Sequence, residues 1–196
     1  VITQNNLWFD ETITIGPDWG FLIEYADGRQ FGYLDQATCL YRIHQTNITM
    51  RVGLQRRARE LAKCRMRAIK MASFQRCSVE TRSAVFYDLL VTLLRGAPEQ
   101  QSLITRWPEF QALPETEQAR LLRLMASKAL LYESDSAHIH AWLRRSRQLN
   151  PTDQAALWLA QVYAINPLLC KWFLRLKTRH EVDPLTIPPF ADLQRV

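Results

Sequence analysis

Three carboxylates near the start of the chain, Asp10, Glu11 and Asp18, are the first residues whose side chains could do chemistry. A carboxylate within hydrogen-bond reach of a hydroxyl can take its proton as a general base. Asp and Glu are also common in turns and at helix N-termini, where the helix dipole favours negative charge. Considered without their surroundings, all three are explained best as such structural residues.

A second group, Arg42 and His44, follows at residues 41–44 (YRIH), which read as the end of a β-strand. Two residues apart on a strand, both side chains share one face. A guanidinium can neutralise an anion, and an imidazole can donate a hydrogen bond or bind a metal. The structural alternative is that the pair caps a neighbouring backbone group.

The order and spacing of these residues resemble the acceptor half of the family 2 glycosyltransferases, which are inverting enzymes with a GT-A fold. The matching pieces, in order, are Phe9-Asp10-Glu11, Asp18-Trp19, Gly32-Tyr33-Leu34, Tyr41-Arg42-Ile43-His44 and Asn47. The resemblance covers only the first quarter of the chain and says nothing direct about the helical remainder.

The resemblance implies a role for each matching residue. Asp18 matches the catalytic base, which takes the proton from the acceptor hydroxyl as its oxygen attacks the anomeric carbon. His44 matches a ligand of a divalent metal, Mg²⁺ or Mn²⁺, or a donor to the diphosphate leaving group. The substrate-binding residues implied in the same way are Asp10, Glu11, Trp19 and Arg42.

The chain also departs from the family pattern in two places. The family often has Glu before the base and a second acid after the Trp, whereas this chain has Pro17 and Gly20. Any role of a neighbouring carboxylate is therefore lost. The donor-binding half, a β/α region that ends in an Asp-x-Asp motif, does not precede these residues.

Because the chain begins with Val1 rather than Met, we expect a C-terminal portion of a longer enzyme. Such an enzyme transfers a sugar from a nucleotide-sugar donor to a glycan or lipid-linked acceptor. These residues alone are expected not to transfer sugar. The alternative is a non-catalytic helical interaction module.

The first 46 residues are predicted to form a short α/β segment, the end of the GT-A-like domain. A helix from Pro17 to about Asp27 is expected between a proline start and the stop at Gly28. Its apolar residues recur at helical spacing and predict one buried stripe. The stripe consists of Trp19, Leu22, Ile23 and Ala26. Residues 31–34 and 38–43 read as two strands.

From residue 47 the chain is predicted to be helical, so the fold class is mostly α with a bundle of about six to seven helices. Residues 47–72 are expected to form one long helix, and Ser78 and Gly96 to cap and stop the next. Pro98 and Pro114 open two more, and Ser134 or Asp135 caps another. Asn150-Pro151 and Asn166-Pro167 begin the last two. The helical domain spans residues 47–177, and residues 178–196 form a proline-rich extended tail.

The net charge of +6 is concentrated in residues 51–70, which carry +7 and leave about −1 for the remainder. A solvated face above an apolar stripe is the usual explanation. The alternative is attraction to anionic lipids at the inner face of the cytoplasmic membrane. Nucleic-acid binding is not expected, because aromatic residues do not alternate with the charges. The basic face consists of Arg56, Arg59, Lys63, Arg67 and Lys70.

The sequence supports neither a zinc site nor a membrane-spanning helix. The four cysteines are too scattered for a zinc site, and no apolar run is long enough to span a bilayer. We therefore expect a cytoplasmic protein.

Overall fold

The structure is a computed structural model that describes residues 7–32, 34–36, 47, 51–132 and 136–179. In that part the chain forms nine α-helices and two short 3-10 helices, with no β-strand. The mostly helical class is therefore confirmed.

The predicted α/β segment is not shown. Phe31, Gly32 and Leu34 belong to no strand, and Phe31 and Leu34 are exposed without a neighbouring strand among the described residues. A strand needs such a neighbour, because its backbone N–H and C=O groups form hydrogen bonds with those of an adjacent strand and not with one another. The second predicted strand, residues 38–43, lies outside the described residues.

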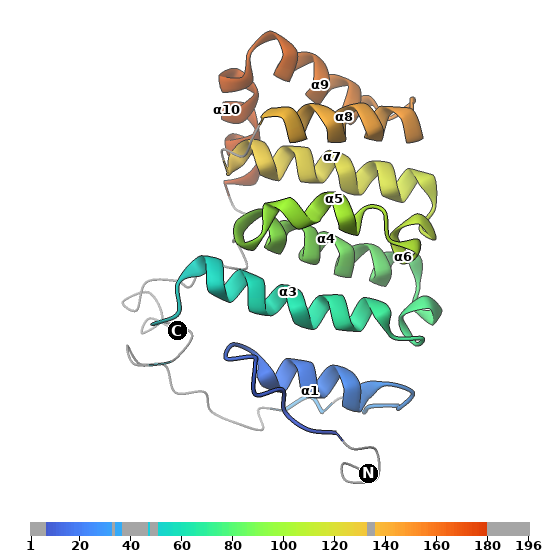
Figure 1. Ribbon diagram of the computed structural model, residues 1–196. Helices are drawn as coiled ribbons and strands as arrows, with labels where there is room; N and C mark the ends of the chain where they lie inside the picture. Colours follow the sequence, from blue (N-terminus) through green and yellow to red (C-terminus); the bar gives the residue numbers. More distant parts are fainter. Residues whose placement is uncertain (1–6, 33, 37–46, 48–50, 133–135, 180–196) are drawn as a thin grey trace.

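The helices follow one another in sequence order along a stack (Figure 1). Two 3-10 helices, η2 and η3, occupy Phe74–Arg76 and Pro98–Gln100. The α-helices are α1 (Pro17–Ala26), α3 (Leu54–Lys70), α4 (Val79–Gly96), α5 (Gln101–Ile104), α6 (Pro108–Gln111), α7 (Glu115–Leu131), α8 (Ser136–Leu149), α9 (Gln154–Ile165) and α10 (Pro167–Thr178).

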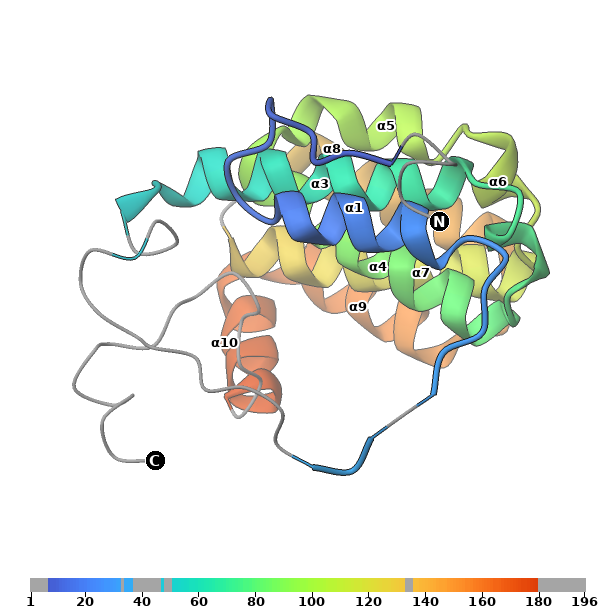
Figure 2. The same cartoon turned by 90° about the horizontal axis from the view of Figure 1, so that it is seen from below.

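Each long helix packs mainly on the next: α1 on α3, α3 on α4, α4 on α7, α7 on α8, α8 on α9 and α9 on α10. The last helix, α10, also turns back to contact α7 and lies to one side of the stack (Figure 2). One apolar core is continuous from α3 to α10. None of the described helices is both long enough and apolar enough to cross a bilayer.

The centre of the core is α4, whose buried face carries Phe86 and a row of leucines. The Phe86 ring meets Phe74 edge-on at 5.8 Å and Phe110 edge-on at 5.2 Å between ring centroids. Such edge-to-face pairs add to the stabilisation from apolar burial. They hold the short elements η2 and α6 against the long helix.

Several helix boundaries match the prediction. The Ser78 hydroxyl accepts a hydrogen bond from Thr81 N at 3.2 Å and so caps α4, as expected. Asn166 Oδ1 accepts from Leu169 N at 3.0 Å and caps α10.

Two predicted boundaries were wrong. The cap of α9 is Asp153 rather than Asn150-Pro151, because the Asp153 carboxylate accepts from Ala155 N and Ala156 N. The long basic helix begins at Leu54 and not near residue 47, because Gly53 before it has an extended backbone with ψ of 148°.

Gly96 is needed for a reason other than the one predicted. It is the last residue of α4, but it is not among the glycines with a positive φ. A Cβ at this position would lie only 2.9 Å from the Cβ of Ala58 and 2.9 Å from the backbone nitrogen of Arg59. Glycine therefore lets α4 approach the backbone of α3 closely.

We predict that Gly96→Ala destabilises the protein by about 1–3 kcal/mol, the usual cost of adding a methyl group to a well-packed contact. Urea unfolding followed by far-UV circular dichroism measures the change. Gly53→Ala is the matched control, since a Cβ at Gly53 meets no atom within 4 Å. Equal stability of the two variants would contradict the proposed role of the close contact.

Candidate functional site

The candidate site lies at the α1 end of the stack, where Glu60 of α3 holds the loop that precedes α1. Glu60 Oε2 accepts hydrogen bonds from Thr14 N at 2.8 Å and from Ile15 N at 2.6 Å. Its other oxygen accepts from Arg56 Nε at 2.9 Å. Arg56 also donates to the Thr14 hydroxyl at 2.8 Å. Glu60, the one acid among residues 51–70, is thus a clamp that attaches the loop to α3.

Glu60 is only 6% exposed, yet it remains an anion. Burial by itself raises the pKa of this carboxyl, but the hydrogen bonds from Arg56, Ile15 and Thr14 outweigh burial and bring the pKa below its ordinary value. The clamp is therefore charged at neutral pH.

Asp10, which the resemblance places in the substrate site, makes a second attachment to α3. Its Oδ1 accepts from the Thr12 hydroxyl at 2.6 Å and from Thr12 N at 2.8 Å, and its Oδ2 forms an ion pair with Arg67. The two Thr12 hydrogen bonds, followed by that from Arg67, lower the pKa of Asp10 to about 2. Both carboxylate oxygens thus have partners within the protein.

The lowered pKa of Asp10 predicts a pH-dependent contribution to stability. The unfolded chain protonates Asp10 near its ordinary pKa of 3.8, whereas the folded chain does so near 2. The stabilisation is therefore complete above the unfolded value and is lost as the pH falls from about 4 to about 2. In urea unfolding, the stability difference between wild type and Asp10→Asn should be constant near neutral pH and shrink across that range.

Glu60 is present in both proteins, so its own titration cancels from the comparison. A stability difference that stays unchanged down to pH 2 would show that the ion pair and turn do not depend on the Asp10 charge.

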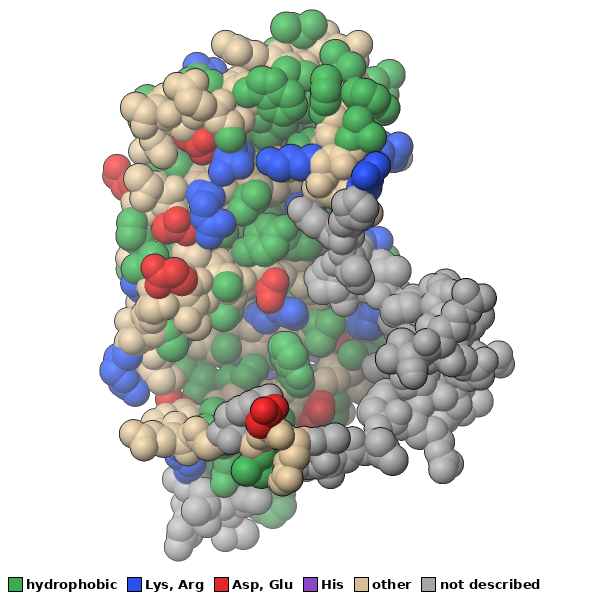
Figure 3. All heavy atoms as spheres, turned by 180° about the vertical axis from the view of Figure 1, so that it is seen from behind, with side chains coloured by type: hydrophobic (Ala, Val, Ile, Leu, Met, Phe, Trp, Pro, Cys, Tyr) green, Lys and Arg blue, Asp and Glu red, His purple; other side chains and the backbone are tan. Residues whose placement is uncertain are grey.

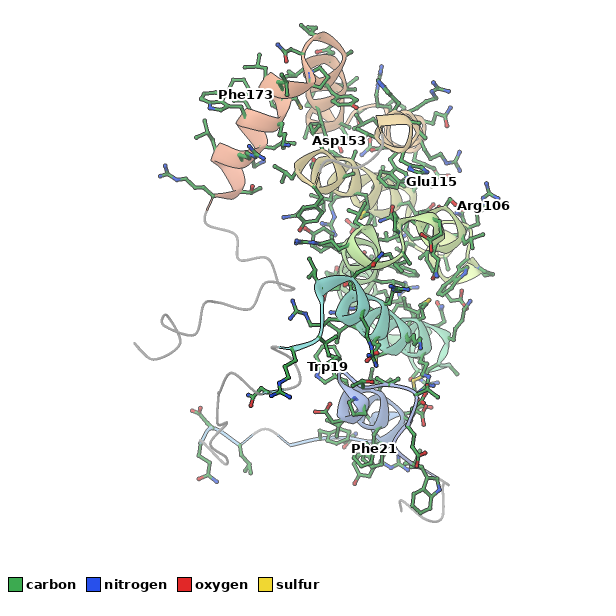
Figure 4. The ribbon with its side chains drawn as sticks, turned by 60° about the vertical axis from the view of Figure 1, so that its left-hand side comes forward. Trp19, Phe21, Arg106, Glu115, Asp153 and Phe173 are labelled. Atoms are coloured by element: carbon green, nitrogen blue, oxygen red, sulfur yellow. The ribbon has the colours of Figure 1, made fainter. Side chains whose placement is uncertain are left out.

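Asp18, the residue matched to the catalytic base, lies exposed in the first turn of α1. Gly16, with a φ of 73°, turns the chain into the helix, and Pro17 occupies its first turn. Successive side chains on a helix are about 100° apart. Asp18 therefore lies between the Trp19 side and the Phe21 side of α1, while Gly20 faces α3; Figure 4 labels both aromatic residues. Glu11 is exposed in the turn before the helix.

The stripe predicted to be buried on α1 is instead the wall of an open groove. Trp19 and Leu22 are 50% and 52% exposed. With Ile23 and Ala26 they border a groove of about 410 Å³ between α1, α3 and α4. The Arg65 guanidinium lies over the Trp19 ring at 5.5 Å. The other lining residues are Ala68, Val85 and Asp88.

Gly20 explains why α1 turns this stripe outward. It is the buried residue of α1, and a Cβ there would lie 3.8 Å from Arg67 Nη1 and Ile13 Cδ1 and 3.9 Å from Cys64 Sγ. The helix thus packs on α3 through its smallest residue, at a distance where an added Cβ would make ordinary van der Waals contacts. A large acid at this position, as in the family pattern, would point at the surface of α3.

The opposite flank of α1 carries a row of aromatic rings that the sequence analysis missed. Phe9 stacks on Phe21 at 4.9 Å, Phe21 on Tyr25 at 5.9 Å, and Phe31 meets Tyr25 edge-on at 5.9 Å. The i, i+4 spacing of Phe21 and Tyr25 could have indicated it. Asp18 therefore lies between the Trp19 side of α1, which borders the groove, and a row of partly exposed rings.

Arg42 and His44 lie outside the described residues, so their predicted roles stay predictions. Among the described residues, no group of three or more His, Cys, Asp or Glu side chains could hold a metal ion. The described part of the site therefore does not itself fit the metal that the resemblance implies.

The basic face of α3 is partly neutralised by internal ion pairs. Lys70 Nζ lies 2.9 Å from Glu109 and 4.0 Å above the Trp107 ring. Arg56 and Arg67 pair with the carboxylates described above. Within the described part of the chain, the two remaining members, Arg59 and Lys63, are exposed.

Comparisons of this chain with protein families, with curated proteins and with solved structures find no match.

Proposed function

We propose that this chain is the C-terminal, acceptor-side portion of an inverting family 2 glycosyltransferase. The observation that supports it best is the position of Asp18. This carboxylate is exposed in the first turn of a helix, directly before Trp19, as the base of the family motif would be. The proposal also depends on the ordered motif pieces on either side of this helix.

In the proposed reaction Asp18 removes the proton of the acceptor hydroxyl. The hydroxyl oxygen forms a bond to the anomeric carbon of the donor sugar from the side opposite the diphosphate. The bond from that carbon to the diphosphate breaks, and the nucleoside diphosphate leaves with the electron pair. A general base must lie within hydrogen-bond reach of the hydroxyl, and its exposed position in the first turn of α1 leaves the Asp18 carboxylate open to such a contact.

The groove beside Asp18 is the proposed acceptor site. Its volume of about 410 Å³ is within the range of small-molecule sites. The exposed Trp19 ring offers a flat apolar face, and Arg65 and Asp88 offer a charged donor and acceptor for hydroxyl groups. An acceptor in this groove would contact Trp19, the residue that directly follows the proposed base.

The rest of the surface at the α1 end is suited to contact the donor-binding half of the proposed enzyme. Trp8, Phe9, Phe31 and Leu34 are large apolar side chains that are more than half exposed at this end. Such a concentration marks an interaction surface. We assign it to the donor-binding half, where Arg42 and His44 would meet the diphosphate and its Mg²⁺ or Mn²⁺.

The reaction can be tested on the longest reading frame that contains these 196 residues. Release of nucleoside diphosphate from a panel of nucleotide sugars measures turnover. We predict that Asp18→Asn lowers turnover by about 10²–10⁴-fold, the usual contribution of a general base. Stability should change little, because Asp18 is exposed.

The matched control is Glu115→Gln, which removes an exposed acid from the first turn of α7, far along the stack in Figure 4. It should leave turnover unchanged. Full activity of Asp18→Asn would refute the assigned base, and turnover by the 196 residues alone would refute the need for a separate donor-binding half.

The second candidate is a non-catalytic helical interaction module. Two observations favour it: the helices pack mainly on their sequence neighbours, as in helical repeat proteins that bind partners, and Asp10 is fully occupied in holding the loop. A reading frame that shows no turnover with any donor would favour this module.

A further inference from the structure

The α10 end of the stack carries an apolar surface that is separate from the candidate active site. Ile165 and Leu168 are 83% and 77% exposed, and Trp172 is 54% exposed. Leu169, Phe173 and Leu176 are exposed beside them. These six residues are called the α10 apolar face below.

The α10 apolar face follows from how the helix is seated. Cys170 and Leu174 are its buried residues, one helical turn apart, and they pack on the core. The larger apolar side chains occupy the other side, and Phe173, labelled in Figure 4, lies at the edge of this side, where it also lines a groove with Trp158 of α9 and residues of α7. The helix is thus apolar toward the protein and apolar toward its surroundings.

Aromatic rings are grouped at the centre of this face. Phe173 meets the Trp172 ring edge-on at 5.0 Å and the Trp158 ring edge-on at 5.9 Å. All three rings are exposed. Tryptophan is the side chain that accumulates where a bilayer meets water, because its ring is apolar and its N–H is polar.

The charges at this end have one sign. Between Gln154 and Thr178 the chain has no acidic residue and three basic ones, Lys171, Arg175 and Lys177. At about 100° per residue, Arg175 lies on one border of the apolar face and Lys177 on the other. Figure 3 shows hydrophobic side chains gathered at this end of the stack with Lys and Arg beside them.

We propose that α10 is an interfacial helix that binds the surface of a membrane containing anionic lipids. Exposed Leu, Trp and Phe side chains enter the boundary between head groups and acyl chains, and the bordering cations remain among the head groups. Surface association of this kind needs no spanning helix. It also places the contact on α10, where exposed aromatic rings adjoin the cations, rather than on α3, where three of the five members of the basic face form ion pairs within the protein.

Co-sedimentation of the whole 196-residue chain with vesicles tests this proposal. We expect binding to vesicles of phosphatidylcholine with phosphatidylserine, much weaker binding to phosphatidylcholine alone, and weaker binding at high salt. The double variant Leu168→Ser/Trp172→Ser should reduce partitioning by about tenfold or more. Far-UV circular dichroism checks that it is folded, and both side chains are exposed.

Two matched controls locate the contact. Leu103→Ser changes an exposed leucine of α5 and should bind like wild type. Arg59→Gln/Lys63→Gln removes two exposed cations of α3 and should reduce binding less than the α10 variant does. Loss of binding in the α3 variant alone would overturn the α10 assignment.

Other outcomes would also overturn the proposal. One is equal non-binding to both kinds of vesicle. Another is concentration-dependent self-association without vesicles that Leu168→Ser/Trp172→Ser abolishes, which would identify the α10 apolar face as an interface between copies of the chain. Neither readout depends on sugar transfer, so a failure here is distinct from a failure of the proposed glycosyltransferase function.

Discussion

The hydrogen bonds to the buried carboxylate of Glu60 are the interaction on which the α1 end of this protein depends. Two consecutive backbone N–H groups and the Arg56 guanidinium donate to it, so a charge that would be costly to bury is fully paired. The loop that it holds leads directly into α1. The direction of α1, and with it the exposure of Asp18, follows from this clamp and from the Asp10–Arg67 pair beside it.

Helix α3, which carries Glu60, contacts each of its two neighbouring helices at a glycine of that neighbour. On one side Gly20 of α1 packs against α3, and on the other Gly96 of α4 meets the backbone at Ala58. Three of the five members of the basic face of α3 form ion pairs within the protein. The two surfaces that we propose to bind partners lie at the two ends of the stack: the proposed acceptor groove at α1, and the apolar face bordered by cations at α10.

Local chemistry predicted much of the helical part. A Ser or Asn followed by an apolar-periodic run indicated the caps at Ser78 and Asn166, since a side-chain oxygen there pairs with an otherwise unsatisfied N–H. The sequence was less informative where a prediction depended on which other part of the protein packs against a given residue. The stripe with Trp19 and Leu22 has helical periodicity, but periodicity identifies only an apolar side and not the element that covers it. Gly96 ends α4 as expected, but the reason that glycine is needed there is the neighbouring backbone of α3.

By itself the sequence determined the helical class, most helix boundaries and the motif order that singles out Asp18, because these depend on residues close together in the chain. Only the tertiary structure decided that Asp10 and Glu60 attach a loop to α3, that an expected core stripe borders a groove, and that α10 turns an apolar face outward. The physical reason is that each of these depends on packing between distant segments. A close backbone contact at a glycine, or a buried carboxylate that needs hydrogen-bond donors, fixes how one segment packs on another. That packing decides which face of a helix is covered.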